Sequence, residues 1–200
     1  MAAELGPWLV LAALPLVLAI ATAFTKSSVV LGALRIGLGA ETLLPWSAML
    51  ALALVVTGIV MAPVALDTLA RVDAAGGVSA LAGADPEVWL AVVEPLTDFL
   101  GRHTDPDELV FFAQLQGVEA ADPRALVPAF LVTELTEALH MAVLIVLPLV
   151  LVDLVVAQGL TLLGLATAPG PLVTLPLKLL LFLAAGGWDV VIGGLVEGYT

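Results

Sequence analysis

The chain has 200 residues, of which 62% are hydrophobic and only 12% are charged, and this composition excludes an ordinary soluble globular protein. Its formal net charge of −12 argues against nucleic acid as a partner, because nucleic-acid binding needs basic contacts to phosphate. The absence of cysteine excludes disulfides, thiolate nucleophiles and cysteine-based metal sites.

Two uncharged runs near the start are long enough to cross a membrane. Leu5 to Phe24 is predicted to be the first span and Leu43 to Leu66 the second, since about 20 apolar residues cross the hydrocarbon core. Glu4 is the only charge before the first run, whereas a signal peptide would carry Lys or Arg there, so we expect the first span to be retained. Residues 1–66 are therefore predicted to form an N-terminal helical hairpin.

Basic residues orient this hairpin. Lys26 and Arg35, with no acid between them, lie in the short connection 25–42. Lys and Arg are enriched in cytoplasmic connections, so the two residues are expected to act as cytoplasmic-side anchors. For Lys26, an alternative is a turn that contacts partner subunits. The second span then crosses the membrane back to the outside, and the segment that follows it should lie outside the cytoplasm.

An acidic segment follows, from residue 67 to residue 124. It contains eleven Asp and Glu against three Lys and Arg, together with turn formers. We expect a small helical domain on the periplasmic side, with helices at 87–100 and 106–115. Asp105 is the expected N-cap of the second helix, because Asp is a preferred capping residue and Pro fits the first helical turn.

The last part, residues 125–200, is predicted to be a C-terminal helical hairpin with spans at about 127–152 and 172–195. Asp153 and Lys178 each interrupt an apolar stretch, on either side of a Gly/Pro-rich connection. A charge near the middle of a bilayer costs a few kcal/mol or more and normally faces a partner. We expect the two to form an ion pair that pins the hairpin. Alternatively, each lies at a helix end and extends to the membrane interface.

The predicted fold class is an all-α membrane protein with about four long hydrophobic helices and a small helical periplasmic insertion. Prolines fall in or beside the spans, and proline is tolerated there when neighbouring helices satisfy the backbone. The prolines are Pro15, Pro63, Pro128, Pro148 and Pro176. Such spans are expected to pack against other protein, as part of a larger assembly.

Glu134, Glu137 and His140 are spaced three apart and lie on one side of a predicted helix. They are interpreted as a polar stripe facing a subunit interface or an aqueous lumen; a water-exposed helix start is the alternative. Glu137-x-x-His140 matches one element of di-iron bundles, but such a site needs that element twice. No nucleophile elbow or phosphate-binding loop is present. Neither an enzyme, a metal site nor a cofactor is expected.

Four segments together resemble the FliP/SctR family of export-gate membrane proteins, found in flagellar and virulence-associated type III secretion. They are TAFTKSSVVLGALRIGLG (22–39), LVPAFLVTELTEAL (126–139), PLVLVDLVVAQGL (148–160) and LPLKLLLFLAAGGW (175–188). The resemblance covers nearly the whole chain in one collinear order. The lack of a leader favours the virulence-associated branch.

The resemblance implies a structural subunit of the bacterial inner membrane. Family members form a pentamer that joins two other membrane proteins, the S and T subunits of the export apparatus, around a channel for unfolded secreted proteins. By position, Asp153 and Lys178 match a family acid and lysine, which implies a polar contact within or between subunits. Leu165, Ala166 and Thr167 fall where many relatives carry a methionine-rich gate loop, and this chain departs from that pattern. A proton-coupled small-solute transporter, with the charged residues as its polar path, is the alternative function.

Overall fold

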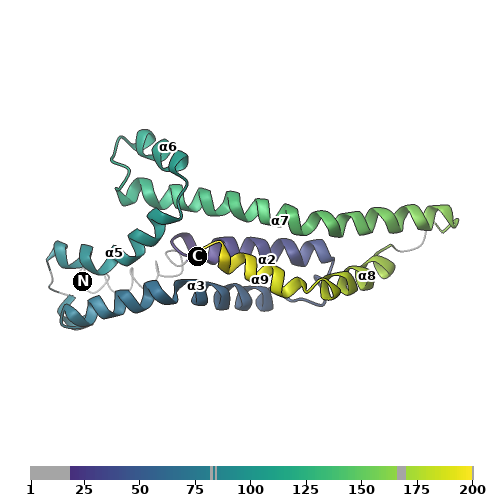
Figure 1. Ribbon diagram of the computed structural model, residues 1–200, viewed down its shortest axis with the longest axis horizontal. Helices are drawn as coiled ribbons and strands as arrows, with labels where there is room; N and C mark the ends of the chain where they lie inside the picture. The colour runs from purple at the N-terminus through teal and green to yellow at the C-terminus, as the bar shows by residue number, and fades with distance from the viewer. Residues whose placement is uncertain (1–18, 82, 84, 166–169, 200) are drawn as a thin grey trace, which may run out of the picture. The chain divides into compact units, whose positions relative to one another are not determined.

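The computed structural model describes residues 19–81, 83, 85–165 and 170–199, and these residues form helices and short connections without any strand (Figure 1). The prediction of an all-α fold is therefore confirmed for the described part of the chain. In the labels of Figure 1, the helices are α2 (Phe24–Leu38), α3 (Trp46–Ala74), α4 (Val78–Leu81), α5 (Pro86–Arg102), α6 (Pro106–Gln116), α7 (Pro123–Leu162), α8 (Pro171–Ala184) and α9 (Gly187–Glu197).

Contacts group the chain into two compact units. Unit 1 comprises the described residues within Met1–Thr25 and Thr57–Leu135, and unit 2 those within Lys26–Val56 and Thr136–Thr200. The long helices α3 and α7 each contribute to both units, because each contains a unit boundary. The division into segments 1–66, 67–124 and 125–200 follows chain order and stays a prediction.

The described residues contain two helices that are long and apolar enough to cross a membrane, α3 with 29 residues and α7 with 40. At a rise of 1.5 Å per residue they measure about 44 Å and about 60 Å, against a hydrocarbon core of about 30 Å. Helices α8 and α9 add a third span at most, since a bend of 61° separates them. The predicted count of about four spans is not confirmed.

The boundaries of the spans also differ from the prediction. Most of the first predicted span, 5–24, lies outside the described residues. The helix of the second span begins at Trp46 and runs on to Ala74, and that of the third runs past Asp153 to Leu162. The observed connection after the third span is therefore shorter than the predicted one, because the apolar sequence on both sides of Asp153 supports one continuous helix.

The fourth predicted span is broken rather than continuous. Gly186 adopts φ +63°, a left-handed conformation that costs glycine no steric penalty and ends α8. At Gly187, a Cβ would lie 2.2 Å from ring carbons of Phe182, so only glycine fits there. The Phe182 ring packs edge-on against Trp188, with centroids 5.1 Å apart. Hydropathy alone shows an unbroken apolar run, and the bend results from this glycine pair.

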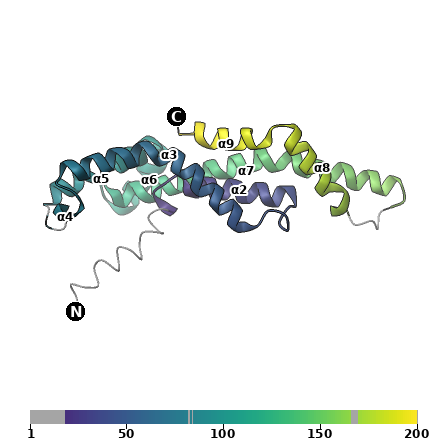
Figure 2. The same cartoon turned by 90° about the horizontal axis from the view of Figure 1, so that it is seen from below.

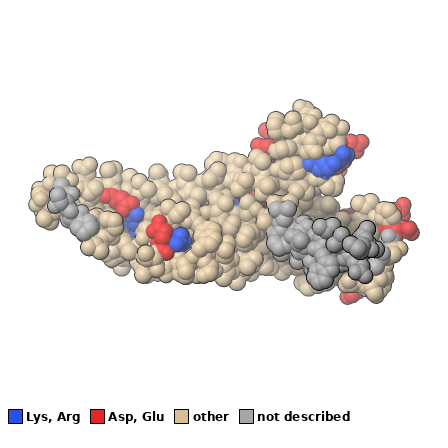
Figure 3. Space-filling view, turned by 180° about the vertical axis from the view of Figure 1, so that it is seen from behind, with Lys and Arg blue, Asp and Glu red and all other residues tan. Residues whose placement is uncertain are grey.

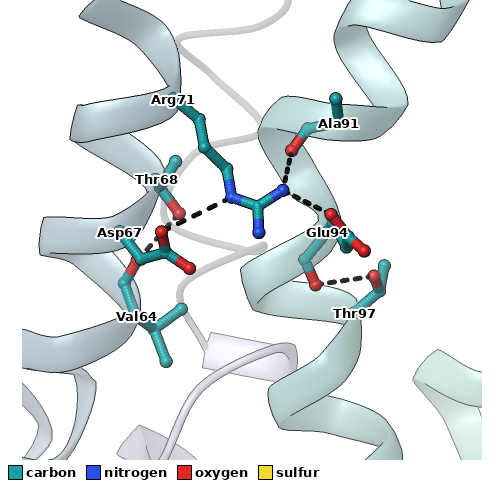
Figure 4. A network of polar contacts seen from close by, with 7 residues as sticks. All are labelled: Val64, Asp67, Thr68, Arg71, Ala91, Glu94 and Thr97. Carbon is teal, nitrogen blue, oxygen red and sulfur yellow. Dashed lines mark hydrogen bonds and ion pairs between the residues drawn. The ribbon is translucent and has the colours of Figure 1, made fainter. Parts of the chain in front are cut away.

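In unit 1, the two predicted helices are confirmed to within two residues as α5 and α6. Asp105 caps α6, as predicted, by accepting a 2.8 Å hydrogen bond from the backbone N–H of Asp107. Figure 4 shows how α5 is tied to α3: Arg71 donates to the carbonyl of Ala91 at 2.9 Å and forms an ion pair with Glu94. These contacts hold α5 to the end of α3.

In unit 2, α2 and α9 both lie along the second part of α7 (Figures 1 and 2). Gly37 of α2 and Gly194 of α9 face α7; a Cβ at these positions would lie 3.0 Å from Val146 and 3.5 Å from Met141. Small residues allow helix backbones to approach closely, which is the usual way that membrane helices pack. The core of unit 2 therefore lies where α2, α7 and α9 meet.

Much of the surface is apolar. On the face drawn in Figure 3, most of the described surface carries no charged side chain. In the most apolar stretch of α7, only 11% of the residues are buried within the chain. Exposed apolar surface of this extent needs lipid or another protein to cover it.

Candidate functional site

The structure brings the two predicted charges of unit 2 together. Lys178 of α8 places its Nζ atom 2.5 Å from Oδ2 of Asp153 on α7. Only 6% of the Lys178 side chain is exposed, against 43% of the Asp153 side chain. The contact therefore joins a buried ammonium to a carboxylate that is open on one side. A lysine extended to the membrane interface would have an exposed ammonium, so this burial disfavours the alternative.

Gly37 supplies a third group to this cluster. Lys178 also donates a 2.9 Å hydrogen bond from Nζ to the carbonyl oxygen of Gly37, in the last turn of α2. The last carbonyls of a helix lack partners within the helix and carry partial negative charge, so a cation there is favourable. One ammonium thus joins α2, α7 and α8. Nothing in the sequence around Gly37 indicates this contact.

A cavity of about 450 Å³ lies beside the pair, between the end of α2, α7 and the start of α8. Its walls are largely apolar, with Val156 and Leu175 among them, and Asp153 and Lys178 form part of its lining. The open side of the Asp153 carboxylate therefore adjoins a space that another molecule or subunit could enter.

The predicted gate loop follows α7. Leu165 is 51% exposed and donates a 2.8 Å backbone hydrogen bond to the carbonyl of Leu160, which closes the end of the helix. Ala166 and Thr167 lie outside the described residues. The role of this loop stays a prediction.

Lys26, expected as a cytoplasmic-side anchor, lies in the interior of unit 2. It is 1% exposed, and its Nζ atom lies 2.6 Å from Oε2 of Glu137, a member of the predicted polar stripe. The ammonium also lies 4.1 Å from the ring centroid of Tyr199. The side of the membrane on which Lys26 lies stays a prediction, but the residue is not positioned as an exposed interfacial anchor.

The other predicted residues occupy different surroundings. Glu134 is fully buried in unit 1, whereas His140 is exposed on α7. Arg35 donates hydrogen bonds to the carbonyls of Leu44, at 2.5 Å, and Glu41, at 2.8 Å, and so stabilises the connection between α2 and α3. The stripe of Glu134, Glu137 and His140 is therefore not uniformly open to water. Within the described ranges, no three His, Asp or Glu side chains gather closely enough to hold a metal ion.

The geometry suits a structural function. The charged side chains of the site join helices to one another. Removing one partner of an ion pair with a buried member strongly destabilises a protein. Fold and site together define an all-helical membrane protein whose apolar helices are held by buried charge contacts.

The comparisons with known proteins identify the family within this class. Residues 8–195 match the FliP family, and the chain belongs to it, as the resemblance predicted. The hypersensitivity response secretion protein HrcR of Ralstonia nicotianae is 36% identical over 203 residues, which cover 94% of this chain and 93% of the relative. The flagellar biosynthetic protein FliP of Caulobacter vibrioides is 34% identical over 203 residues, covering 97% and 74%. The virulence protein YscR of Salmonella typhimurium is 31% identical over 209 residues, covering 98% and 95%.

Proposed function

We propose that this chain is a structural subunit of the export apparatus of a type III protein secretion system. The observation that carries the proposal is the match to the FliP family over residues 8–195, which includes residues of both units. Relatives matched over most of this chain are named for hypersensitivity response secretion, flagellar biosynthesis and virulence. In this function the chain is not an enzyme and uses no cofactor. Its side chains hold the wall of a channel in shape.

The chain acts in this proposal as a homo-oligomer, a pentamer, which joins the S and T membrane subunits and encloses the path of unfolded secreted proteins. The sparse burial of α7 within the chain supports an assembly, because its uncovered apolar side chains are available to neighbouring subunits. The cavity beside Asp153 supports it too, since it offers a half-exposed carboxylate at the surface of unit 2.

The proposed location is the bacterial inner membrane, with the acidic segment 67–124 facing the periplasm. The support comes from charge: this segment carries eleven acidic residues against three basic ones, while Arg35 lies in the preceding connection. Basic connections stay in the cytoplasm. The comparisons do not support the alternative function, a proton-coupled small-solute transporter.

Native mass spectrometry tests the assembly. The chain is expressed first alone and then together with its candidate S and T partners, and is extracted in detergent each time. A discrete pentamer that gains the mass of both partners is the expected result. A monomer or dimer that ignores the partners would contradict the proposal, and ion or solute flux in vesicles would then be measured.

The proposed gate loop has its own test, because the chain contains no cysteine and a single introduced thiol is the only one present. In a pentamer, Leu165→Cys should form disulfide-linked dimers under mild oxidation if the loop lines the shared axis. Leu144→Cys is the matched control, since Leu144 is also well exposed but lies far from the end of α7. Equal cross-linking of the two variants would contradict an axial loop.

A further inference from the structure

Lys26 forms a second charged centre in unit 2, apart from the pair at Asp153. Its ammonium lies in the first turn of α2, while Lys178 bonds to the carbonyl of Gly37 in the last turn of the same helix. Lys26 contacts Glu137 on α7 at 2.6 Å and the ring of Tyr199, beyond α9, at 4.1 Å from its centroid. We infer that Lys26 is a positioning residue for α9: the Lys26 ammonium holds the end of this helix against α2 and α7.

The contact with Tyr199 has the geometry of a cation–π interaction, which requires the cation within about 6 Å of the ring centroid. Gly198, directly after α9, also lies near the ammonium, since a Cβ built there would be 3.8 Å from the Lys26 Nζ atom. Helix C-termini carry partial negative charge, so the ammonium is attracted by the helix end as well as by the ring. Lys26 therefore acts on α9 through two neighbouring groups.

Helix α9 has low intrinsic stability and needs contacts with other helices. It has 11 residues, two of which are the interior glycines Gly193 and Gly194. Short helices are marginal in isolation, and glycine lowers helix stability further. Its start is fixed by the turn at Gly186 and by the packing of Phe182 against Trp188. Lys26 supplies the corresponding constraint at the other end.

The exposure of the partners supports a positioning function rather than an aqueous path. The Lys26 side chain is 2% exposed and that of Glu137 is 53% exposed. The buried member is the cation, and its carboxylate partner closes one side of the site while the aromatic ring covers another. This arrangement concerns the fold of unit 2, and it holds whether or not the chain belongs to an export gate.

Tyr199 makes the contact directly observable, because it is the only tyrosine of the sequence. Incorporation of 3-fluorotyrosine into the full chain gives a single ¹⁹F resonance that reports on the ring. Lys26→Met should shift this resonance towards that of an exposed tyrosine, and Lys26→Arg, which keeps a cation, should restore it. An unchanged resonance in a folded Lys26→Met variant would overturn the inference.

A double variant separates folding from positioning. Lys26→Met alone leaves Glu137 half-exposed, whereas Glu137→Gln alone leaves a buried ammonium with its ring partner. Lys26→Met combined with Glu137→Gln removes both members of this ion pair, so it should fold, yet its Tyr199 resonance should stay shifted. A native resonance in this folded double variant would also overturn the inference.

A second measurement does not alter Lys26 at all. With Val196→Cys as the only thiol, a thiol reagent reports how tightly the end of α9 is held. Tyr199→Leu removes the ring that faces the cation, so the rate at which this thiol is labelled should increase by about threefold to tenfold. Tyr199→Phe keeps the ring and should label at the original rate. Val190→Cys, at the start of α9 and 66% exposed, is the control and should respond to neither change. Equal rates for the Leu and Phe variants would overturn the inference.

Discussion

Removal of Asp153 should destabilise unit 2 more than removal of Lys178. Asp153→Asn leaves the Lys178 ammonium, with a side chain 6% exposed, with the Gly37 carbonyl as its remaining partner among the described residues. An ion pair broken so that a buried charge is left behind costs about 3–5 kcal/mol. Lys178→Met instead leaves a carboxylate whose side chain is 43% exposed. Its cost should be about 1–3 kcal/mol, the value for a buried polar group, here the Gly37 carbonyl, that loses its partner.

The assay is unfolding of the detergent-extracted chain, followed by tryptophan fluorescence and by the loss of the folded peak in size-exclusion chromatography. The double variant, Asp153→Asn with Lys178→Met, should be more stable than Asp153→Asn alone, because it leaves no buried charge. Asp122→Asn is the matched control. Asp122 pairs with Arg124 at 2.7 Å on the surface, and exposed pairs contribute little to stability.

Two results would refute this reasoning. If Lys178→Met lowered stability more than Asp153→Asn, the difference in burial would not determine the cost. If both single variants unfolded like the unchanged chain, the ion pair would not stabilise unit 2 at all. The first result would refute the argument from burial, and the second would refute a stabilising contribution of the pair to unit 2.

Three further predictions concern local structure. Gly187→Ala should cost about 1–3 kcal/mol or more, because its Cβ would lie 2.2 Å from a phenylalanine ring, whereas Gly193→Ala, with open space around it, should be neutral or stabilising; thermal unfolding distinguishes the two. Asp105→Ala should lower helix stability by about 0.5–2 kcal/mol and Asp105→Ser much less, since serine also caps; hydrogen exchange of the first turn of α6 measures both. Hydrogen bonds from Arg124 lower the pKa of Asp122 from 3.8 to about 2; the small contribution of this solvent-screened pair to stability is present above pH 3.8 and is lost as the pH falls through about 2. Carboxyl NMR should show this low midpoint, and Arg124→Met should raise it.

Local sequence patterns predicted those parts of the structure that depend on near neighbours. The bounds of α5 and α6 and the cap at Asp105 were accurate, because caps and first turns involve residues a few positions apart. The opposite charges in two apolar runs also indicated that Asp153 and Lys178 lie together, since an isolated charge in an apolar setting is costly.

Other features could not be predicted from these patterns. The burial of Lys26 was missed because a basic residue in a short connection is normally a sign of sidedness, and no local signal distinguishes an exposed lysine from one that meets Glu137 and Tyr199. The continuation of α7 to Leu162 was missed because a charge was expected to mark the end of the span, whereas the apolar residues on both sides of Asp153 form one helix.

By itself, the sequence determined that this protein is all-helical, apolar and a member of the FliP family, because helix periodicity, composition and motifs are written in consecutive residues. Only the tertiary structure decided which additional groups contact each buried ammonium: the carbonyl of Gly37 contacts Lys178, and the ring of Tyr199 contacts Lys26. The same holds for the bend between α8 and α9, where Gly187 fits against Phe182. The physical reason is that these contacts depend on how closely separate helices approach, and that distance is set by packing rather than by the sequence of any one helix.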